Sequence, residues 1–230
     1  MKLACSSTAF DEQLRRGDLT QLEWIDACAR ELAVDGAVFD VRHFPRADTD
    51  YLAQIKKMCT DLGLTVAALR HDGFFCNGME HMEQTFLTAL TLGAPLVAAP
   101  LEPVTTVSWT QSLERLNDAA ALAKRLNVTI ALRNVPNTHA ASVHDMKRAA
   151  KEADSAWLRF GPDLDSLEAG DDFHELLPKT VLVWHGYVGP FVAVGSYRGF
   201  IVLDAPQGDA TIGSMQNALA GWRAHFVSTA

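Results

Sequence analysis

The chain has 230 residues, 48% of them hydrophobic, which is enough to bury one sizeable core, and we expect a single domain over residues 1–230. Its formal net charge of −8 argues against a general nucleic-acid or anionic-membrane surface, because such surfaces need a basic patch. No apolar run is long enough to span a bilayer, so the expected partner is a small molecule rather than a nucleic acid or a membrane.

The four cysteines are scattered and form no Cys-x-x-Cys pair. This pattern is typical of a reduced, cytoplasmic protein rather than of a disulfide framework or a zinc knuckle. We therefore expect mostly buried free thiols at Cys5, Cys28, Cys59 and Cys76.

Strand patterns and helix patterns alternate along the chain. The predicted strands lie, in chain order, at residues 2–7, 37–41, 65–69, 95–101, 128–134, 156–161, 180–185 and 199–203. Apolar residues at helical spacing predict helices near residues 20–32, 51–62, 80–92, 108–126 and 142–153, and a closing helix over residues 212–226. A capping box from Thr20 to Glu23 and a glycine stop at Gly63 mark two helix ends.

This repeated alternation favours a closed (β/α)8 TIM barrel over an open doubly wound sheet. The connection from residue 185 to residue 199 has no helical pattern and is too short for a helix with its loops. We therefore expect the helix between strands seven and eight to be missing or reduced. No Gly-x-Gly-x-x-Gly or phosphate-loop pattern follows any strand, so a nucleotide-binding fold has no direct support.

The fifth predicted strand indicates which of its faces lies inward. Val128, Ile130 and Leu132 share one face, while Ala131 and Arg133 share the other. We expect the aliphatic face to lie under the helices. Arg133 then points into the lumen of the barrel, near its top.

Polar residues stand at the ends of most predicted strands. They are His43, His71, Glu102, Arg133 with Asn134, Asp163, His185 and Asp204. One polar residue at a strand end is ordinary, because strands end where they meet water. Ligands and catalytic groups also collect at the carboxyl ends of parallel strands, so together these residues predict a site.

Segments spread over nearly the whole chain carry a family pattern, namely Met-Lys-Leu-Ala-Cys-Ser-Ser, Asp-Leu-Gly-Leu-Thr-Val-Ala-Ala-Leu, Leu-Gly-Ala-Pro-Leu-Val and Gly-Phe-Ile-Val-Leu-Asp. Through them the chain resembles the xylose isomerase-like TIM barrels, the sugar phosphate isomerase/epimerase superfamily that also includes the endonuclease IV fold. The resemblance implies a divalent metal held by Glu, Asp, His and Glu from the ends of strands five to eight. It also implies two glutamates that move the proton.

On this resemblance, Asp163 and His185 stand at the strand-six aspartate and the strand-seven histidine. Asp204 stands at the strand-eight glutamate and is one methylene shorter, while Arg133 stands at the strand-five glutamate. Two further family positions, a histidine and a glutamate, are changed to Ser166 and Val38. The implied metal ligands are therefore Asp163, His185 and Asp204, in a depleted site.

Arg133 has a specific consequence for metal binding. A guanidinium is an obligate cation, which cannot ligate magnesium or manganese and repels them. We therefore expect divalent manganese, magnesium or zinc to bind weakly or not at all. Arg133 would instead lie between Asp163 and Asp204 and replace the charge of the metal.

Two other arrangements stay open. Glu102 and a rearranged Asp204 would complete a looser metal site with Asp163 and His185. Otherwise Arg133 turns outward, to solvent or to the loop at Asn134.

Candidate substrate-binding residues at the same end of the barrel are His43, His71, Asn134 and Trp184. His71 with Asp72 would act as an acid/base pair, or would only hydrogen-bond to backbone at the loop edge. Trp184 would stack on a sugar ring, but its strand alternates it away from the face of His185, which favours packing in the core.

The sequence therefore predicts an isomerase or epimerase that acts on or binds a small polyhydroxy compound, a sugar or sugar phosphate, at the C-terminal mouth of the barrel. Asp163, His185 and Asp204 would surround the reacting oxygens, and Glu102 or His71 would serve as acid or base. The alternative is a non-catalytic sugar-binding relative that has lost metal-dependent activity. A homo-oligomer is compatible with either function, and the depleted ring and acidic charge disfavour DNA repair of the endonuclease IV kind.

Overall fold

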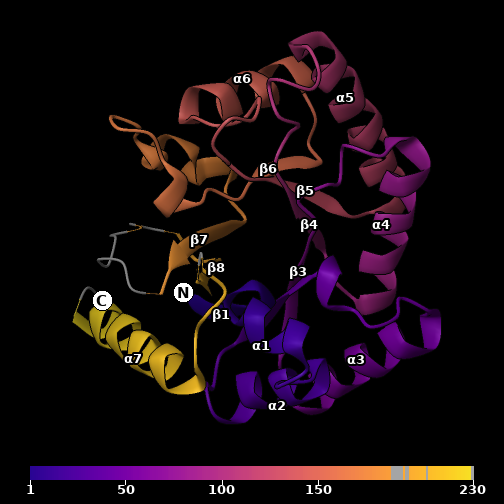
Figure 1. The fold of residues 1–230 in the computed structure, drawn as a ribbon. Helices are drawn as coiled ribbons and strands as arrows, with labels where there is room; N and C mark the ends of the chain where they lie inside the picture. The colour runs from indigo at the N-terminus through magenta and orange to yellow at the C-terminus, as the bar shows by residue number, and fades with distance from the viewer. Residues whose placement is uncertain (188–193, 195–196, 206, 229–230) are drawn as a thin grey trace.

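The computed structural model describes residues 1–187, 194, 197–205 and 207–228, and the side chains among them up to residue 225. Eight parallel strands form one curled sheet in the order β6-β5-β4-β3-β2-β1-β8-β7 (Figure 1). The strands are β1 (Lys2–Ser6), β2 (Gly36–Asp40), β3 (Thr65–Arg70), β4 (Leu96–Ala99), β5 (Thr129–Leu132), β6 (Leu158–Phe160), β7 (Leu182–Gly186) and β8 (Phe200–Asp204).

The two outermost strands of this order, β6 and β7, meet through single parallel bridges. The backbone N–H of Val181 donates to the carbonyl of Phe160 at 2.9 Å, and the N–H of Trp184 donates to the carbonyl of Pro162 at 2.8 Å. These bridges close the sheet on itself and cover its two edges. The fold is the (β/α)8 TIM barrel that the alternating patterns predict.

Helices surround the sheet on its outer side (Figure 1). The α-helices are α1 (Asp11–Arg16), α2 (Gln21–Arg30), α3 (Thr49–Asp61), α4 (Gly78–Leu92), α5 (Trp109–Leu126), α6 (Val143–Ala153) and α7 (Ile212–Ser228). The short 3-10 helices are η1 (Ser7–Phe10), η2 (Val41–His43), η3 (Leu164–Ser166) and η4 (Phe173–Lys179). Capping boxes at Thr20 and Ser108 begin α2 and α5, because these side chains bond the free N–H groups of the first turn.

Side chains alternate along the strands between two apolar layers. On β5, Ile130 and Leu132 pack outward with the helices, while Ala131 packs in the barrel interior. The interior layer contains Ala4, Val38, Ala67, Ala68, Ala98, Ala131, Leu182, Trp184 and Val202. The prediction for strand five is thus confirmed, and Arg133 follows Ala131 on the interior side at the top of the barrel.

The crossover from β6 to β7 contains η3 and η4 but no α-helix. The expected loss of a helix between strands seven and eight concerns residues 188–193 and 195–196, which lie outside the described residues. No sequence pattern predicts α1, because its 6 residues are too few to show helical periodicity.

The four cysteines are free thiols, with Cys5, Cys28 and Cys59 buried and Cys76 exposed, as expected from their spacing. Among the helices of the described ranges, none combines the length and the apolar character needed to cross a membrane.

Candidate functional site

Charged side chains converge where the strands end, at the C-terminal mouth of the barrel. We call this group the mouth cluster, and its members are Asp40, Arg70, Asp72, Arg133, Asp163 and Asp204. Interior positions recur at every second residue of a strand, so Asp40, Arg70 and Asp204 continue the interior rows of β2, β3 and β8. The sequence thereby brings two guanidinium groups among carboxylates at one end of the lumen.

Arg133 is the most buried cation of the mouth cluster, with a side chain only 3% exposed. Its Nη2 donates to Asp163 Oδ2 at 2.9 Å and its Nη1 donates to Asp72 Oδ1 at 3.1 Å. The indole of Trp184 faces it, with the guanidinium carbon 4.4 Å from the ring centroid. Arg133 therefore lies between two carboxylates as predicted, but its second partner is Asp72 and not Asp204.

Asp204, which does not pair with Arg133, pairs with Arg70 instead. Nη1 of Arg70 donates to Asp204 Oδ2 at 2.9 Å, while Nε and Nη2 hold Asp72 in a two-pronged contact at 3.1 and 2.8 Å. The hydroxyl of Thr8 also reaches Asp204, at 2.8 and 2.9 Å from its two oxygens. These partners hold Asp204 away from Arg133, which is why the predicted pairing does not form.

The same contacts set the charge of the mouth cluster. Burial raises the pKa of Asp72, but the hydrogen bonds and charge of Arg70, together with the charge of Arg133, outweigh burial and lower this pKa to about 2. Burial and the charge of Arg70 lower the pKa of Arg133, whose guanidinium still stays protonated at neutral pH. Asp72 and both arginines are therefore charged under physiological conditions.

A cavity of about 260 Å³ opens over one side of the mouth cluster, and its lining includes Thr8, Asp11, Arg42, Arg70, Asp72 and Asp204. Arg42 donates from Nε and Nη2 to Asp40 at 2.9 and 3.2 Å, and its side chain is 55% exposed. Guanidinium donors and carboxylate acceptors thus face one small space. A ligand with several hydroxyl groups can use both kinds of partner, because each hydroxyl is a donor and an acceptor.

Asn134 supports the mouth cluster from behind. Its Oδ1 accepts from the backbone N–H of Asp163 at 2.6 Å, and its Nδ2 donates to the Asp163 carbonyl at 2.9 Å. The residue is fully buried, so its contact with substrate stays a prediction. Asn134 instead fixes the backbone that carries Asp163.

β7 presents Trp184, and not His185, to the lumen. Trp184 is fully buried in the interior layer, so its ring is not available to stack on a sugar. His185 lies on the helix side, with its ring centroid 5.0 Å from that of Trp222 in α7 and its Nδ1 2.7 Å from the Gly186 carbonyl. Alternation thus turns residue 185 towards α7 once residue 184 fills the lumen, while the charge of His185 still acts on Asp165, and a catalytic role for His185 stays a prediction.

Glu102, a predicted acid or base, binds α5 instead of the mouth cluster. Its Oε2 accepts from the hydroxyl of Ser112 at 2.5 Å and its Oε1 accepts from Nη1 of Arg115 at 2.8 Å. The side chain is 1% exposed. A carboxylate so held ties the loop after β4 to α5 and is not open to a substrate.

The two predicted histidines of strands two and three contact neighbouring elements. His43 is buried, with Nδ1 2.8 Å from Ser7 Oγ and Nε2 2.8 Å from Asp11 Oδ1. His71 lies with its Nε2 3.3 Å from Nε2 of His81 in α4, and burial followed by the charge of His81 lowers the pKa of His71. Neither histidine takes part in the ion pairs of the mouth cluster.

The residues present do not fit a divalent metal centre. Across the described ranges, no group of three or more His, Cys, Asp or Glu side chains is arranged to hold a metal ion. Of the predicted ligands, Asp163 binds Arg133, Asp204 binds Arg70, and His185 lies on the far side of β7. A dication needs several oxygen or nitrogen donors around one point, and here a buried guanidinium takes the central position.

Sequence reasoning missed Asp40, Arg70 and Asp165 as site residues. Asp40 and Arg70 share strand parity with the interior residues Val38 and Ala68, and that alternation is the signal that would have found them. Burial raises the pKa of Asp165, with His185 opposing the rise and the charges of Asp163 and Asp204 adding to it. Only its position two residues after Asp163 points to it in the sequence.

Comparison with known proteins relates this barrel to a described family and to solved structures. Residues 27–188 match the sequence profile of the family described as xylose isomerase-like TIM barrel. No curated protein sequence matches the chain.

Among solved structures, a fusion of a xylose isomerase-like TIM barrel with a 4-hydroxyphenylpyruvate dioxygenase is 17% identical, with a TM-score of 0.76. The match covers 97% of this chain but only 42% of the fusion protein.

Two further structures match over nearly their whole length. The 3-keto-D-glucoside 4-epimerase of E. coli is 15% identical with a TM-score of 0.76, covering 97% of this chain and 99% of the epimerase. A probable 3-DHS dehydratase of Bacillus anthracis is 13% identical with a TM-score of 0.74, covering 96% of this chain and 98% of the dehydratase. At these identities the likeness shows the shared barrel and not a shared reaction.

Proposed function

Because this chain belongs to the xylose isomerase-like TIM barrel family, we propose that it binds a short polyhydroxy compound at the C-terminal mouth of its barrel and acts on it as an isomerase or epimerase without a resident divalent metal. The observation that carries this proposal is the buried guanidinium of Arg133 between Asp72 and Asp163. It supplies fixed positive charge at the position where the family resemblance puts a glutamate ligand.

The size of the mouth cavity favours a small ligand. Its volume of about 260 Å³ is below the roughly 300–1,000 Å³ of sites for drug-sized molecules. A compound of a few carbons fits such a space. Its hydroxyl groups would donate to Asp72 and Asp204 and accept from Arg42 and Arg70, which all line the cavity.

Proton transfer next to a carbonyl needs a cation near the oxygen and a group that carries the proton. The exposed guanidinium of Arg42 and the adjacent Arg70 supply the cation, since fixed donors stabilise a developing negative charge on oxygen. Asp165 is the candidate for the group that carries the proton, because its carboxylate lies against Gly186 at the end of β7 and burial raises its pKa. This assignment replaces Glu102 and His71, which bind other elements.

The proposal is tested by proton exchange in deuterated water. Protein treated with a chelator is incubated with short ketoses and their phosphates, and NMR follows deuterium uptake at the carbon next to the carbonyl. We expect deuterium uptake that survives the chelator and is lost in Asp165→Asn. It should be kept in the control Asp172→Asn, because Asp172 is an exposed residue that caps η4. Uptake that requires added manganese, magnesium or zinc would contradict a metal-free reaction.

A specific observation also favours a second candidate, binding without turnover. Apart from Asp165, the carboxylates of the mouth are already held by guanidinium groups, as in the pairs of Asp163 with Arg133 and of Asp204 with Arg70. A paired carboxylate is a poor base, because the arginine stabilises its charged form. Saturable ligand binding in NMR titrations without any deuterium uptake would select this non-catalytic function.

A further inference from the structure

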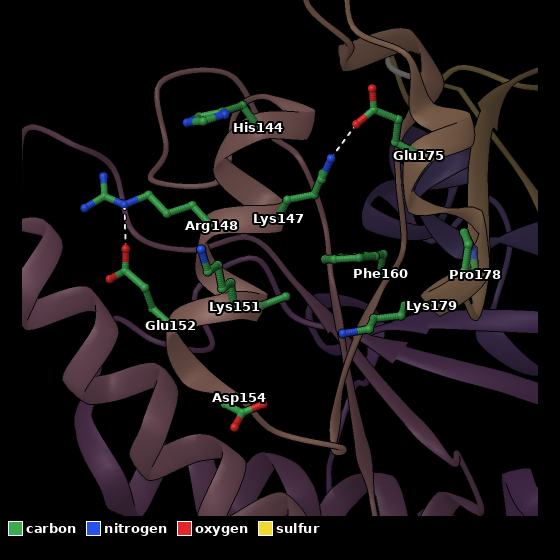
Figure 2. Close-up of a pocket in the computed structure, with 11 residues that line it drawn as sticks. His144, Lys147, Arg148, Lys151, Glu152, Asp154, Phe160, Glu175, Pro178 and Lys179 are labelled. Carbon is green, nitrogen blue, oxygen red and sulfur yellow. Dashed lines mark hydrogen bonds and ion pairs between the residues drawn. The ribbon is translucent and has the colours of Figure 1, made fainter.

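A second cavity lies outside the barrel, on the flank between α6 and η4. Its volume is about 710 Å³, within the roughly 300–1,000 Å³ range of small-molecule sites. Figure 2 shows side chains of α6 along one wall, Glu175, Pro178 and Lys179 along the other, and Phe160 between them. We call this cavity the flank groove.

The flank groove follows from the way the chain crosses from β6 to β7. The other described parallel crossovers contain an α-helix, whereas this one contains the short 3-10 helices η3 and η4. A helix of full length would cover the outward face of β6 beside α6. η4 has 7 residues and covers only part of that face, so the groove reaches Phe160.

Apolar groups form the floor of the flank groove. The ring of Phe160, the methyl group of Ala150 and the ring of Pro178 all line it. The aliphatic stems of the lysines extend this surface, because long charged side chains present their methylene groups to apolar contacts. Phe160 is buried and closes the floor, so the apolar surface open to a ligand comes from Pro178, Ala150 and the lysine stems.

The rim of the flank groove carries several cationic side chains, and the charge of one of them, Lys151, also acts on Glu152. Arg148 and Glu152 also line the groove, but Arg148 donates to Glu152 at 2.8 Å and its guanidinium carbon lies 4.0 Å from the ring centroid of Trp109, so these two charges are already paired. Among the described residues, the structure gives Lys151 and Lys179 no ion-pair partner within 4.0 Å. Asp154 is the acidic lining residue without such a partner, and Figure 2 shows it at the far end of α6.

One ion pair closes the opposite end of the groove. Lys147 of α6 contacts Glu175 of η4 at 2.5 Å, and the two side chains are 51% and 52% exposed. An exposed pair of this kind contributes about 0–1 kcal/mol, so an incoming anion can compete with Glu175 for the lysine. Lys147, Lys151 and Lys179 all line the groove.

We propose that the flank groove binds a small organic anion that joins a flat apolar body to a phosphate or carboxylate group. The apolar body lies against Pro178 and Ala150, and the anionic group contacts Lys179 and Lys151. This site is separate from the mouth cluster, because none of its lining residues belongs to the mouth cavity. It gives the barrel a second small-molecule site, independent of what the mouth binds.

The test uses phenyl phosphate, benzoate and inorganic phosphate as probes in NMR titrations of the full chain. We expect saturable shifts confined to α6 and η4 for the two aromatic probes and weaker binding of inorganic phosphate, which lacks the apolar body. The variants Lys151→Gln and Lys179→Gln should each weaken binding about fivefold, the factor that corresponds to one exposed ion pair. Lys124→Gln on α5 is the matched control, since this exposed lysine does not line the groove.

The probes also identify the anionic group. Tighter binding of phenyl phosphate than of benzoate would assign a phosphate ligand, and the reverse would assign a carboxylate. The proposal is overturned if no aromatic probe saturates, if the shifts fall on the mouth cluster, or if Lys124→Gln weakens binding as much as the groove variants.

Discussion

Arg133 lies against the indole of Trp184, with its guanidinium carbon 4.4 Å from the ring centroid. The interior layer below is made mostly of alanine and valine, so Trp184 supplies the large side chain that fills the lumen there. A guanidinium is planar and weakly hydrated, and it stacks on an aromatic face more readily than a lysine would. The pair thus gives the buried charge an aromatic face on one side and the carboxylates of Asp72 and Asp163 on the other.

Replacing Arg133 by methionine should lower the free energy of unfolding by about 3 kcal/mol. The reason is that Asp163 and Asp72 would each lose a cation while remaining in a partly buried site. Urea denaturation measures the change. Arg30→Met is the control, because Arg30 pairs with Asp26 on an exposed helix surface and should cost no more than about 1 kcal/mol. An equal decrease in the free energy of unfolding of the two variants would show that the buried ion pairs of Arg133 stabilise the fold no more than an exposed pair.

Arg133→Glu should create affinity for a divalent ion, because it removes the repelling cation and adds a carboxylate next to Asp163 and Asp72. We expect manganese to bind at least about tenfold more tightly than to the unmodified chain, by calorimetric titration. Arg133→Gln separates the two effects, since it removes the charge without adding a strong ligand. If Arg133→Glu gains no affinity, Arg133 does not replace the charge of a metal.

The strands and the position of Arg133 could be predicted from local pattern alone. Val128, Ile130 and Leu132 alternate with Ala131 and Arg133, and this alternation fixes which face lies inward. The partner of Arg133 could not be predicted, because the choice between Asp72 and Asp204 depends on where Arg70 reaches across the mouth.

β7 shows the limit of the same reasoning. Its residues Leu182, Val183 and Trp184 are apolar without alternation, since both faces of the strand are buried. Nothing in such a run says which face lies inward. The position of His185 at the end of the strand predicts a site residue, but the packing of Trp184 in the lumen places His185 on the helix side.

Asp72 should make stability fall at low pH. Its folded-state pKa of about 2 is below the ordinary value of 3.8, so the stabilisation is fully present above about pH 4 and is lost as the pH falls towards 2. The side chain is 46% exposed, so solvent screens its ion pairs and the contribution is about 1 kcal/mol or less. Urea denaturation between pH 5 and pH 2 would measure it, and Asp72→Asn should show a shallower loss. Parallel curves for the two proteins would contradict this role.

Gly186 lies against the carboxylate of Asp165, which occupies the space that a larger side chain at position 186 would need. A Cβ at this position would overlap the Asp165 carboxylate, whereas a Cβ at Gly213 in α7 has no heavy atom within 4 Å. Gly186→Ala should therefore displace the Asp165 carboxylate and lower the free energy of unfolding by about 1 kcal/mol or less, while Gly213→Ala should be neutral or stabilising. If Asp165 carries the proton, Gly186→Ala should also slow deuterium uptake by a bound ketose, and Gly213→Ala should not. A Gly186→Ala variant with unchanged stability and unchanged uptake would mean that the position of Asp165 matters to neither.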